Sequence, residues 1–334
     1  MSMLNSPWLA AHGKLWYDDK PYRIAWIVWP QALAAALLLW FWFAPSSVST
    51  KAQWAKPMDQ AARVQQLATL RDNAKSSQQA MDALERAASG GEAMAQFYYA
   101  TLFDPNFKLS TIVAPDENKA IGWYQRSATQ GNQLSIGNLA LGYYFGQLGR
   151  KDNTRACYYA RTITKDAGAN ALRVKGDCYA QGLGGTQVDM TAAAAAYELS
   201  STGGNSHATA ALGYFYENGV GGRPKSPETA LKYYRFAADK GDALGLHNLG
   251  YAYNAGLLGL QRDANESSRL IMQALDGKYE VTVQSLTNRP EYWTGEFWQS
   301  LQRRLAERGL YSGPADGRPN SATLDAVRRL GRRQ

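Results

Sequence analysis

Few residues of this 334-residue chain have the types and spacing that catalysis or metal binding requires. The histidines are His12, His207 and His247, and none of them belongs to an H-x-x-H or H-E-x-x-H pattern. Glu291 and Glu296 could serve as a glycosidase carboxylate pair, but a gap of five on a helix places them on different faces. Because no nucleophile, base and orienting residue come together, we predict no enzyme activity, no metal and no cofactor.

The two cysteines, Cys157 and Cys178, could react with each other. They stand at equal distances from a turn that we predict near residues 166–169, so they would face each other across an antiparallel helix pair. A disulfide and two buried thiols both fit this placement, because a disulfide needs Cα atoms within about 7 Å, closer than most helices approach. If formed, the bond would stabilise the fold by about 3 kcal/mol and would place the array outside the cytoplasm.

The elements that position these residues repeat along the chain. Glycines recur at steps of 36 to 40 residues, at Gly91, Gly131, Gly168, Gly204, Gly241 and Gly277. A second set of glycines follows within the next predicted helices, at Gly142, Gly176, Gly213 and Gly250. A fixed period of this length is typical of a solenoid, in which each unit buries its apolar face by stacking on its neighbours. We expect helix hairpins with left-handed glycines at the turns, small residues where helices cross, and Tyr and Leu between units.

A long apolar stretch precedes the repeats. Residues 24–44 contain 21 residues without a charge, which as a helix would span roughly 30 Å, and tryptophans lie near both ends. This pattern predicts a cytoplasmic segment over 1–23, an uncleaved transmembrane helix over 24–45 and a linker over 46–57. Three basic residues precede the span and three follow it closely, so charge alone leaves the orientation open.

The repeat pattern resembles the Sel-one-like subclass of tetratricopeptide-type repeats. Residues 115–132 (PDENKAIGWYQRSATQGN) and 226–256 (SPETALKYYRFAADKGDALGLHNLGYAYNAG) match the family pattern A..WY..AA..G...A...LG..Y..G, and the likeness covers roughly residues 75–285. The resemblance implies an all-α, right-handed superhelical solenoid over 58–288, whose concave face binds proteins or peptides. It also implies that a disulfide would join the two helices of one repeat.

The array departs from the family pattern in three places. An insert occupies residues 103–118, the unit near Arg155 has a longer predicted first helix, and the last unit near Ser268 lacks its aromatic pair. The insert is the expected partner-specific loop. Most aromatic residues are expected in the core, with one or two on the concave face, from the set Phe97, Tyr98, Tyr99, Tyr143, Tyr144 and Tyr214.

The C-terminal stretch 297–330 (FWQSLQRRLAERGLYSGPADGRPNSATLDAVRRL) breaks the repeat. It resembles the small peptidoglycan-binding domain of cell-wall hydrolases, with the pattern LQ..L...GYY.GP.DG..G..T..AV..FQ, and implies a helical domain over 289–334. The wall-binding residues that the resemblance suggests are Gln302, Tyr311, Asp316, Gly317 and Arg318. The chain departs from the pattern at Asn320, Ser321 and Arg329–Leu330, and a helical cap on the solenoid is the alternative.

From Gln299 to Gln334 the chain has eight arginines and three acidic residues, against a net charge of +8 overall. Such an end is a solvated face or meets an anionic partner. A wall-binding module would face the periplasm, so we expect a single-pass inner-membrane scaffold with its C-terminal bulk in the periplasm, protein partners, peptidoglycan contact and no nucleic acid. The alternatives are a cytoplasm-facing adaptor with its basic tail on lipid or nucleic acid, and a regulatory subunit of a wall hydrolase.

Overall fold

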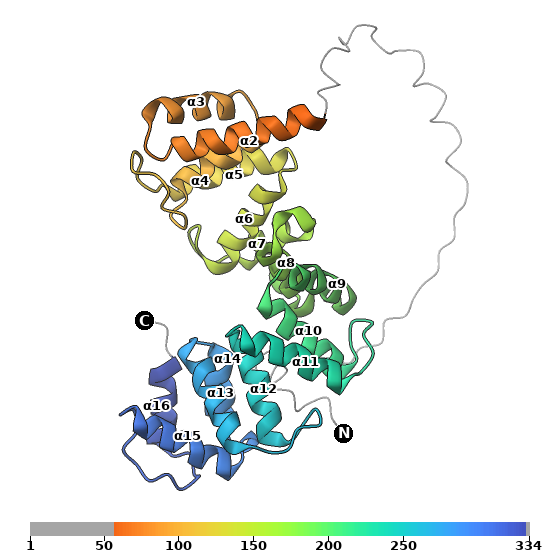
Figure 1. Ribbon diagram of the computed structural model, residues 1–334, viewed down its shortest axis with the longest axis vertical. Coiled ribbons are helices and arrows are strands. Elements are labelled where there is room, and N and C mark those ends of the chain that lie inside the picture. Colours follow the sequence, from red (N-terminus) through yellow and green to blue (C-terminus); the bar gives the residue numbers. More distant parts are fainter. Residues whose placement is uncertain (1–56, 332–334) are drawn as a thin grey trace, which may run out of the picture.

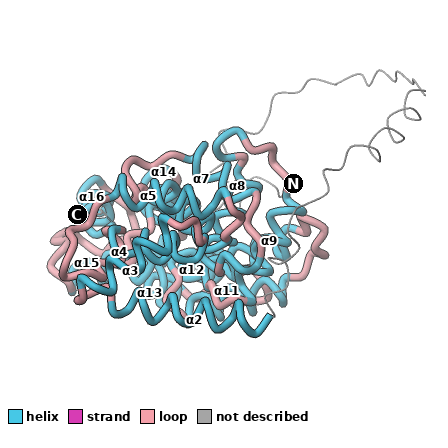
Figure 2. Tube along the Cα trace, turned by 90° about the horizontal axis from the view of Figure 1, so that it is seen from above, coloured by secondary structure: helices cyan, strands magenta, loops and turns pink. Residues whose placement is uncertain are grey.

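The computed structural model describes residues 57–331, which form helices and loops without any strand (Figure 2). Its helices are α2 (Pro57–Asn73), α3 (Gln78–Ser89), α4 (Ala93–Phe103), α5 (Glu117–Thr129), α6 (Gln133–Phe145), α7 (Asn153–Arg161), α8 (Ala169–Gln181), α9 (Met190–Thr202), α10 (Ser206–Asn218), α11 (Pro227–Asp239), α12 (Ala243–Ala255), α13 (Ala264–Asp276), α14 (Glu280–Asn288), α15 (Gly295–Glu307) and α16 (Ser321–Gly331). Short 3-10 helices occur at η1 (Lys165–Ala167), η2 (Leu183–Gly185) and η3 (Pro290–Tyr292). In this part of the chain no helix has the length and apolar character of a membrane span. The predicted transmembrane helix over 24–45 lies outside the described residues.

The helices form an elongated stack that runs from α2 and α3 at one end to α15 and α16 at the other (Figure 1). We call α4, α6, α8, α10 and α12 the inner helices, and α5, α7, α9, α11 and α13 the outer helices. Each inner helix packs on the outer helix that follows it, and successive inner helices such as α6 and α8 or α10 and α12 also touch. Outer helices are spread further apart. The inner helices therefore line the inside of the curve, and the predicted all-α solenoid is confirmed.

Each helix of the array begins and ends where its sequence favours it. Outer helices start after an Asp or Ser whose side chain accepts a backbone N–H three residues on, as Asp116 does from Lys119 and Asp189 does from Ala192. Glycines between an outer helix and the next inner helix take the left-handed conformation, for example Gly131 with φ 81° and Gly204 with φ 92°. These caps satisfy backbone groups that a helix end leaves free.

The last turn of the array differs from the others. Gly277 has φ −70°, and Lys278 adopts the left-handed conformation instead, with φ 55°. Gly277 corresponds to Gly203, the residue that ends α9, so the turn keeps its geometry and has Lys278 in place of a glycine at its left-handed position. Tyr279 is the N-cap of α14 and makes no capping side-chain hydrogen bond.

The prediction of a longer helix near Arg155 is wrong. α7 has nine residues, whereas α9 and α11 have 13 each. Thr162 ends α7, and the chain continues into η1, where Thr164 accepts the N–H of Asp166. A local side-chain hydrogen bond of this kind competes with further helix formation.

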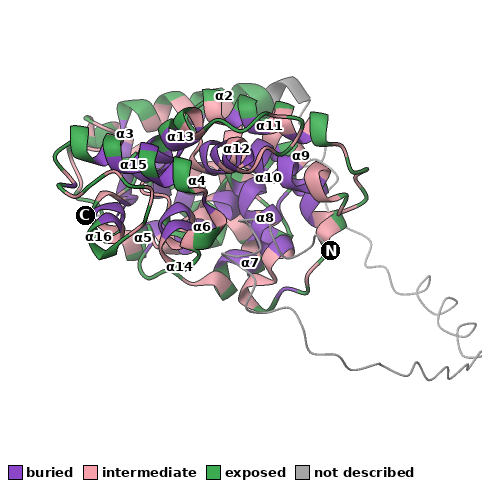
Figure 3. Cartoon of the chain, turned by 90° about the horizontal axis from the view of Figure 1, so that it is seen from below, coloured by how far each residue is buried: buried purple, intermediate pink, exposed green. Residues whose placement is uncertain are grey.

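Buried residues run along the inner helices, as the purple segments of α8, α10 and α12 show in Figure 3. At the C-terminal end, α14, α15 and α16 pack around Trp293, Phe297, Trp298 and Leu301. The same buried cluster includes Ile271 and other residues of α13. The predicted boundary at 288/289 falls between α14 and η3, inside this shared core.

Candidate interaction surface

An inner helix and the outer helix that follows it meet at a joint, where an aromatic ring fills the space above a glycine. The ring of Tyr197 in α9 lies so close to Gly176 in α8 that a Cβ there would stand 2.4 Å from the ring. Tyr234 in α11 lies against Gly213 in α10 in the same way, at 2.5 Å. Both tyrosines are buried. These contacts explain the second set of glycines: a larger residue would push the two helices apart.

The register of Gly142 differs from that of the other glycines in its set. Gly176 and Gly213 each stand six residues before the glycine that ends their helix, and this spacing places Ala140, not Gly142, at the equivalent site before Gly146. Gly142 instead lies under Leu148. Ala140 is buried in one cluster with Ala160, which stands where α9 has Tyr197. The small partner on α7 compensates for the extra methyl group on α6.

The buried tyrosines that stand eight residues after the N-cap of their outer helix also donate a hydrogen bond to a carboxylate. Tyr124 donates to Asp104 at 2.9 Å, and Tyr234 donates to Glu217 at 2.7 Å. Burial raises the pKa of both tyrosines above the ordinary range, and burial also raises the pKa of Glu217. The carboxylates orient the rings and give each joint a polar end that does not tolerate an apolar neighbour.

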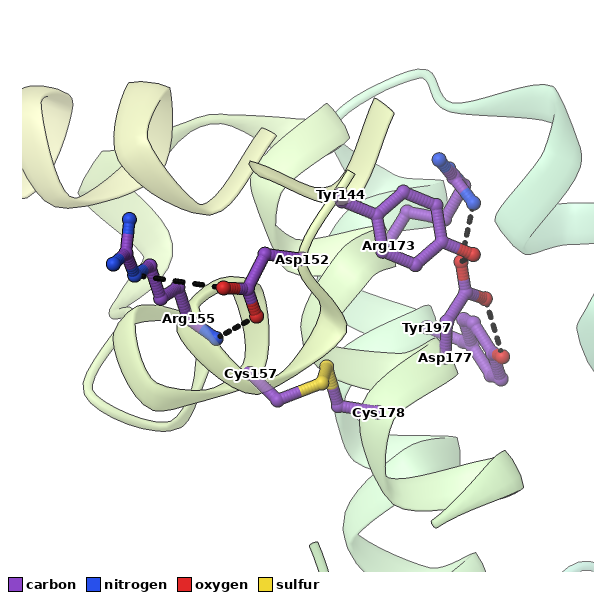
Figure 4. Close-up of a disulfide and its surroundings, with 8 residues drawn as sticks. All are labelled: Tyr144, Asp152, Arg155, Cys157, Arg173, Asp177, Cys178 and Tyr197. Atoms are coloured by element: carbon purple, nitrogen blue, oxygen red, sulfur yellow. Dashed lines mark hydrogen bonds and ion pairs between the residues drawn. A yellow bond between two sulfur atoms is a disulfide. The ribbon is translucent and has the colours of Figure 1, made fainter. Parts of the chain in front are cut away.

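The largest of these polar groups lies between α6, α8 and α9 (Figure 4). Asp177 accepts hydrogen bonds from Tyr197 at 2.8 Å and from Tyr144 at 2.9 Å, and it forms an ion pair with Arg173. The Arg173 guanidinium also lies 5.2 Å from the ring centres of Tyr144 and Phe145. Although burial alone would lower the pKa of Arg173, the charge of Asp177 raises it. Asp177 was not predicted from the sequence, because nothing in its spacing distinguishes it from a surface acid.

The disulfide lies beside this polar group. Cys157 in α7 is bonded to Cys178 in α8, with Cα atoms 5.7 Å apart, and both residues are fully buried (Figure 4). The short α7 and the η1 turn bring the two helices this close. Among residues 57–331 there is no other cysteine.

The inner face is covered over α10 and α12. The ring of Tyr279, at the start of α14, lies 6.4 Å from His207 of α10 and 6.2 Å from His247 of α12, measured between ring centres. His247 is fully buried and its Nδ1 is 3.1 Å from the hydroxyl of Thr282. Asp242 completes the group through a 3.2 Å contact with His207. The chain's own C-terminal part therefore fills this half of the inner face.

The inner face over α4 and α6 is open and apolar. Leu134 stands two residues after its N-cap Asn132, as His207 does after Asn205, and Phe97 stands five after Glu92, as His247 does after Asp242. This register puts both residues on the inner face. Leu134 is 36% exposed and Phe145, at the end of α6, is 48% exposed.

The six aromatic residues that were predicted mostly for the core differ in burial. Tyr99, Tyr143 and Tyr214 are buried, and Phe97, Tyr98 and Tyr144 are half-buried.

The insert over 103–118 is tied to the open end of the array. Thr111 donates from its backbone N–H to the carbonyl of Lys75 at 2.8 Å, and Leu109 and Val113 pack on the core of α3 to α5. Phe107 at its tip is 45% exposed. This arrangement fits a loop that adds contact area at the edge of the inner face.

The residues suggested for wall binding divide into two groups. Gln302 is fully buried: its Nε2 donates to the carbonyl of Arg318 at 2.9 Å and to Thr323, while its Oε1 accepts the N–H of Gly317 at 3.0 Å. Tyr311 is 6% exposed and donates to the carbonyl of Pro314 at 3.0 Å. Gly317 has φ 79° and lies against the backbone of Gly295. These three hold the loop before α16 in place.

Asp316 and Arg318 are the exposed members of the suggested set, and Asp316 accepts the N–H of Arg318 at 2.9 Å. They are the two whose side chains face solvent.

The residues considered for chemistry lie apart from one another. Glu291 belongs to η3 and Glu296 to the first turn of α15, and both are exposed. No group of three or more His, Cys, Asp or Glu residues with metal-binding geometry occurs within residues 57–331.

Together, the stacked hairpins and their joints define an α-helical repeat solenoid, the class of fold that holds other proteins. Comparison with protein families gives its kind. The Sel1 repeat model matches residues 93–132, 135–162, 176–205, 206–242 and 243–267. Residues 93–267 are an array of Sel1 repeats, which typically mediate protein–protein interaction as scaffolds.

Two solved structures share the fold. A Sel1 repeat protein from Oxalobacter formigenes superposes with a TM-score of 0.57 at 22% identity, covering 83% of this chain and 98% of that one. A protective antigen present in uropathogenic Escherichia coli strains, which displays an SLR fold, gives a TM-score of 0.51 at 20% identity; the match covers 81% of this chain and 61% of the antigen. The comparison with curated proteins found no match.

The matched ranges change the phase of the repeat. Each of them begins at or within an inner helix, so recurring glycines such as Gly131, Gly204 and Gly241 lie at the ends of repeats and not at the turn in the middle of one. Cys157 belongs to the repeat over 135–162 and Cys178 to the repeat over 176–205. The disulfide thus joins two successive repeats, and the expectation that it links two helices of one repeat is wrong.

Proposed function

We propose that this protein is a membrane-anchored periplasmic scaffold, which binds a partner protein on the open inner face of α4 and α6 and contacts peptidoglycan through its C-terminal helices. The observation that carries the proposal is the division of the inner face. Tyr279 fills it over α10 and α12, while Leu134 remains exposed over α6. An apolar concave surface of this kind suits a partner segment with apolar side chains.

Site-specific photocrosslinking in cells tests the partner surface. A photoreactive phenylalanine analogue at Leu134 should give a defined crosslinked product. The matched control is Leu199, which is 50% exposed on the outer helix α9. Equal products from both positions, or none from Leu134, would contradict an inner-face partner.

The disulfide supports a compartment outside the cytoplasm, since cytosolic thiols are kept reduced. The uncharged stretch 24–44 supports the anchor and lies outside the described residues. A Ser321→Cys variant places a thiol on the exposed start of α16. A membrane-impermeant maleimide should label it once the outer membrane is opened. Labelling that requires disruption of the inner membrane would point to the cytoplasm-facing adaptor instead.

Wall contact is supported by the basic surface around α15 and α16, where Arg303, Arg308 and Arg318 are exposed. Deleting these helices is a poor test because their core includes residues of α13. Instead, replacing the three arginines by glutamine should reduce sedimentation with purified sacculi severalfold. Unchanged sedimentation of the folded triple variant would remove the wall from the proposal.

A further inference from the structure

A hollow of about 550 Å³ lies between the loop after α15 and the outer side of α16. Its lining consists of Leu310, Tyr311, Ser312, Ala322, Asp325, Arg328 and Arg329. The volume falls within the range of sites for small organic ligands and peptides, and a single inorganic anion would fill only a small part of it.

The two arginines of the hollow are held in place from one side only. Arg329 donates from Nη2 to the carbonyl of Leu310 at 2.7 Å, and Arg328 donates from Nη1 to Asp325 at 2.7 Å. Within residues 57–331 Arg329 has no ion-pair partner. Each guanidinium carries five N–H groups in a fixed fork, so donors remain on both for a ligand.

The charge of the lining selects an anion. Arg328 and Arg329 outweigh Asp325, and the exposed Arg303, Arg308 and Arg318 lie on the same C-terminal part. A planar guanidinium fork matches a carboxylate in a bidentate way. Leu310, Ala322 and the ring of Tyr311 supply an apolar side to the hollow, which suits the aliphatic body of a short peptide rather than a sugar phosphate.

We propose that this hollow binds a short peptide with a free carboxylate, and that Arg329 receives the carboxylate. Arg328 lies beside it and is kept from swinging away by Asp325. The inference deepens the wall contact proposed above and rests on it for one source of the peptide, the stem peptide of peptidoglycan. The C-terminus of a protein offers the same chemistry. Gln302, Tyr311 and Gly317 would act here as positioning residues, because they fix the loop and α16 relative to each other.

Titration of the full-length protein in mild detergent tests the proposal. The probes are a fluorescent tripeptide of L-Ala, γ-D-Glu and meso-diaminopimelate, an α-linked Ala-Glu-Ala peptide, and the amidated form of each. At least one acid form should bind at least tenfold more tightly than its amide. Binding by the stem tripeptide assigns the wall as source, and binding by the α-peptide assigns a protein C-terminus. Binding by neither acid form, or equal binding of acid and amide, overturns the proposal.

Three variants locate the binding. Arg329→Gln should weaken binding of the acid form of the peptide at least tenfold. Ala322→Trp should weaken it as much, because the larger side chain fills the hollow without changing an arginine. Arg235→Gln, at an exposed arginine of α11 outside the C-terminal part, should stay within twofold. Thermal unfolding checks that each variant is folded. Equal effects of Arg329→Gln and Arg235→Gln would overturn the site.

Sacculus sedimentation of Ala322→Trp separates this inference from wall contact. If the variant no longer binds the tripeptide but still sediments with sacculi, wall contact stands and the hollow is not the site of that contact. If the wild-type protein binds the α-peptide but does not sediment with sacculi, the hollow stands and wall contact fails.

Discussion

Cys157 and Cys178 form a covalent bond across the boundary between two repeats, at a place where neither residue is exposed to solvent. Elsewhere in the described array the repeats are joined by packing and hydrogen bonds alone. The first of these two repeats is also the one in which Ala160 occupies the site that Tyr197 and Tyr234 occupy in the next two repeats. The disulfide therefore fixes a repeat that lacks the tyrosine joint between its own two helices to the repeat that follows it.

Removal of the disulfide should destabilise the array. The Cys157→Ala, Cys178→Ala double variant should lose about 3 kcal/mol of unfolding free energy, because the unfolded chain is no longer constrained by a loop of 21 residues. Urea unfolding followed by circular dichroism measures the loss. Wild-type protein unfolded in reductant should approach the variant. A double variant as stable as the oxidised protein would show that the bond is not formed or not stabilising.

Filling the space above a glycine of a joint should lower the free energy of unfolding. Gly213→Ala would place a Cβ 2.5 Å from the ring of Tyr234, and we expect a loss of about 1–3 kcal/mol from the forced separation of α10 and α11. The control is Gly122→Ala in α5, where a Cβ meets nothing within 4 Å and better helix propensity should give a gain of about 0.5–1 kcal/mol. Thermal unfolding of both variants decides the matter, and similar shifts in the two would refute the joint.

Substitution of Asp177 should lower the free energy of unfolding more than the loss of a surface ion pair does. Asp177→Ala leaves the Arg173 guanidinium buried without its counter-charge, and a loss of about 3–5 kcal/mol is expected. Tyr197→Phe removes one hydrogen bond and should cost about 1 kcal/mol. Arg269→Gln, which breaks an exposed pair with Glu266, is the control and should change the unfolding free energy by less than about 0.5 kcal/mol. Equal losses from Asp177→Ala and Arg269→Gln would contradict the assigned burial.

His247 should make the fold sensitive to mild acid. Burial lowers its pKa from 6.5 to about 3, so the unfolded chain takes up a proton below pH 6.5 that the folded chain does not. The unfolding free energy should therefore fall as the pH drops from 6.5 towards 3, by at most about 1.4 kcal/mol per pH unit from this residue. Equilibrium unfolding at pH 7.5 and pH 5 measures the slope. His247→Phe should reduce the difference between the two pH values, and an unchanged difference would show that His247 is protonated in the folded chain.

The repeat architecture was predictable because it depends on local features. A glycine at a turn, an Asp or Ser at an N-cap and a small residue in a crossing helix each act on a few neighbouring residues, and the period makes them visible. Gly176 and Gly213 were found in this way. The phase of the repeat was not, since α8 packs on both α7 and α9, and the sequence does not say which pair is the unit.

The covering of the inner face could not be predicted from the sequence. It depends on Tyr279 reaching residues of α10 and α12 that lie more than 30 positions earlier in the chain. Asp177 was not predicted for a related reason: its surroundings are made by three side chains, Tyr144, Arg173 and Tyr197, which come from three helices. Gln302 was recognised by its place in a motif, and only the structure shows that its amide is fully used inside the domain.

The joints also restrict how such an array can change over time. Gly213 accepts Tyr234, Gly250 accepts Ile271, and Ala140 shares its cluster with Ala160, so each inner helix is matched to the outer helix that follows it. A single helix exchanged between repeats would bring one half of two different pairs and would fit its new partner badly. A complete repeat keeps its own pair, so the array changes most easily by the gain or loss of whole repeats.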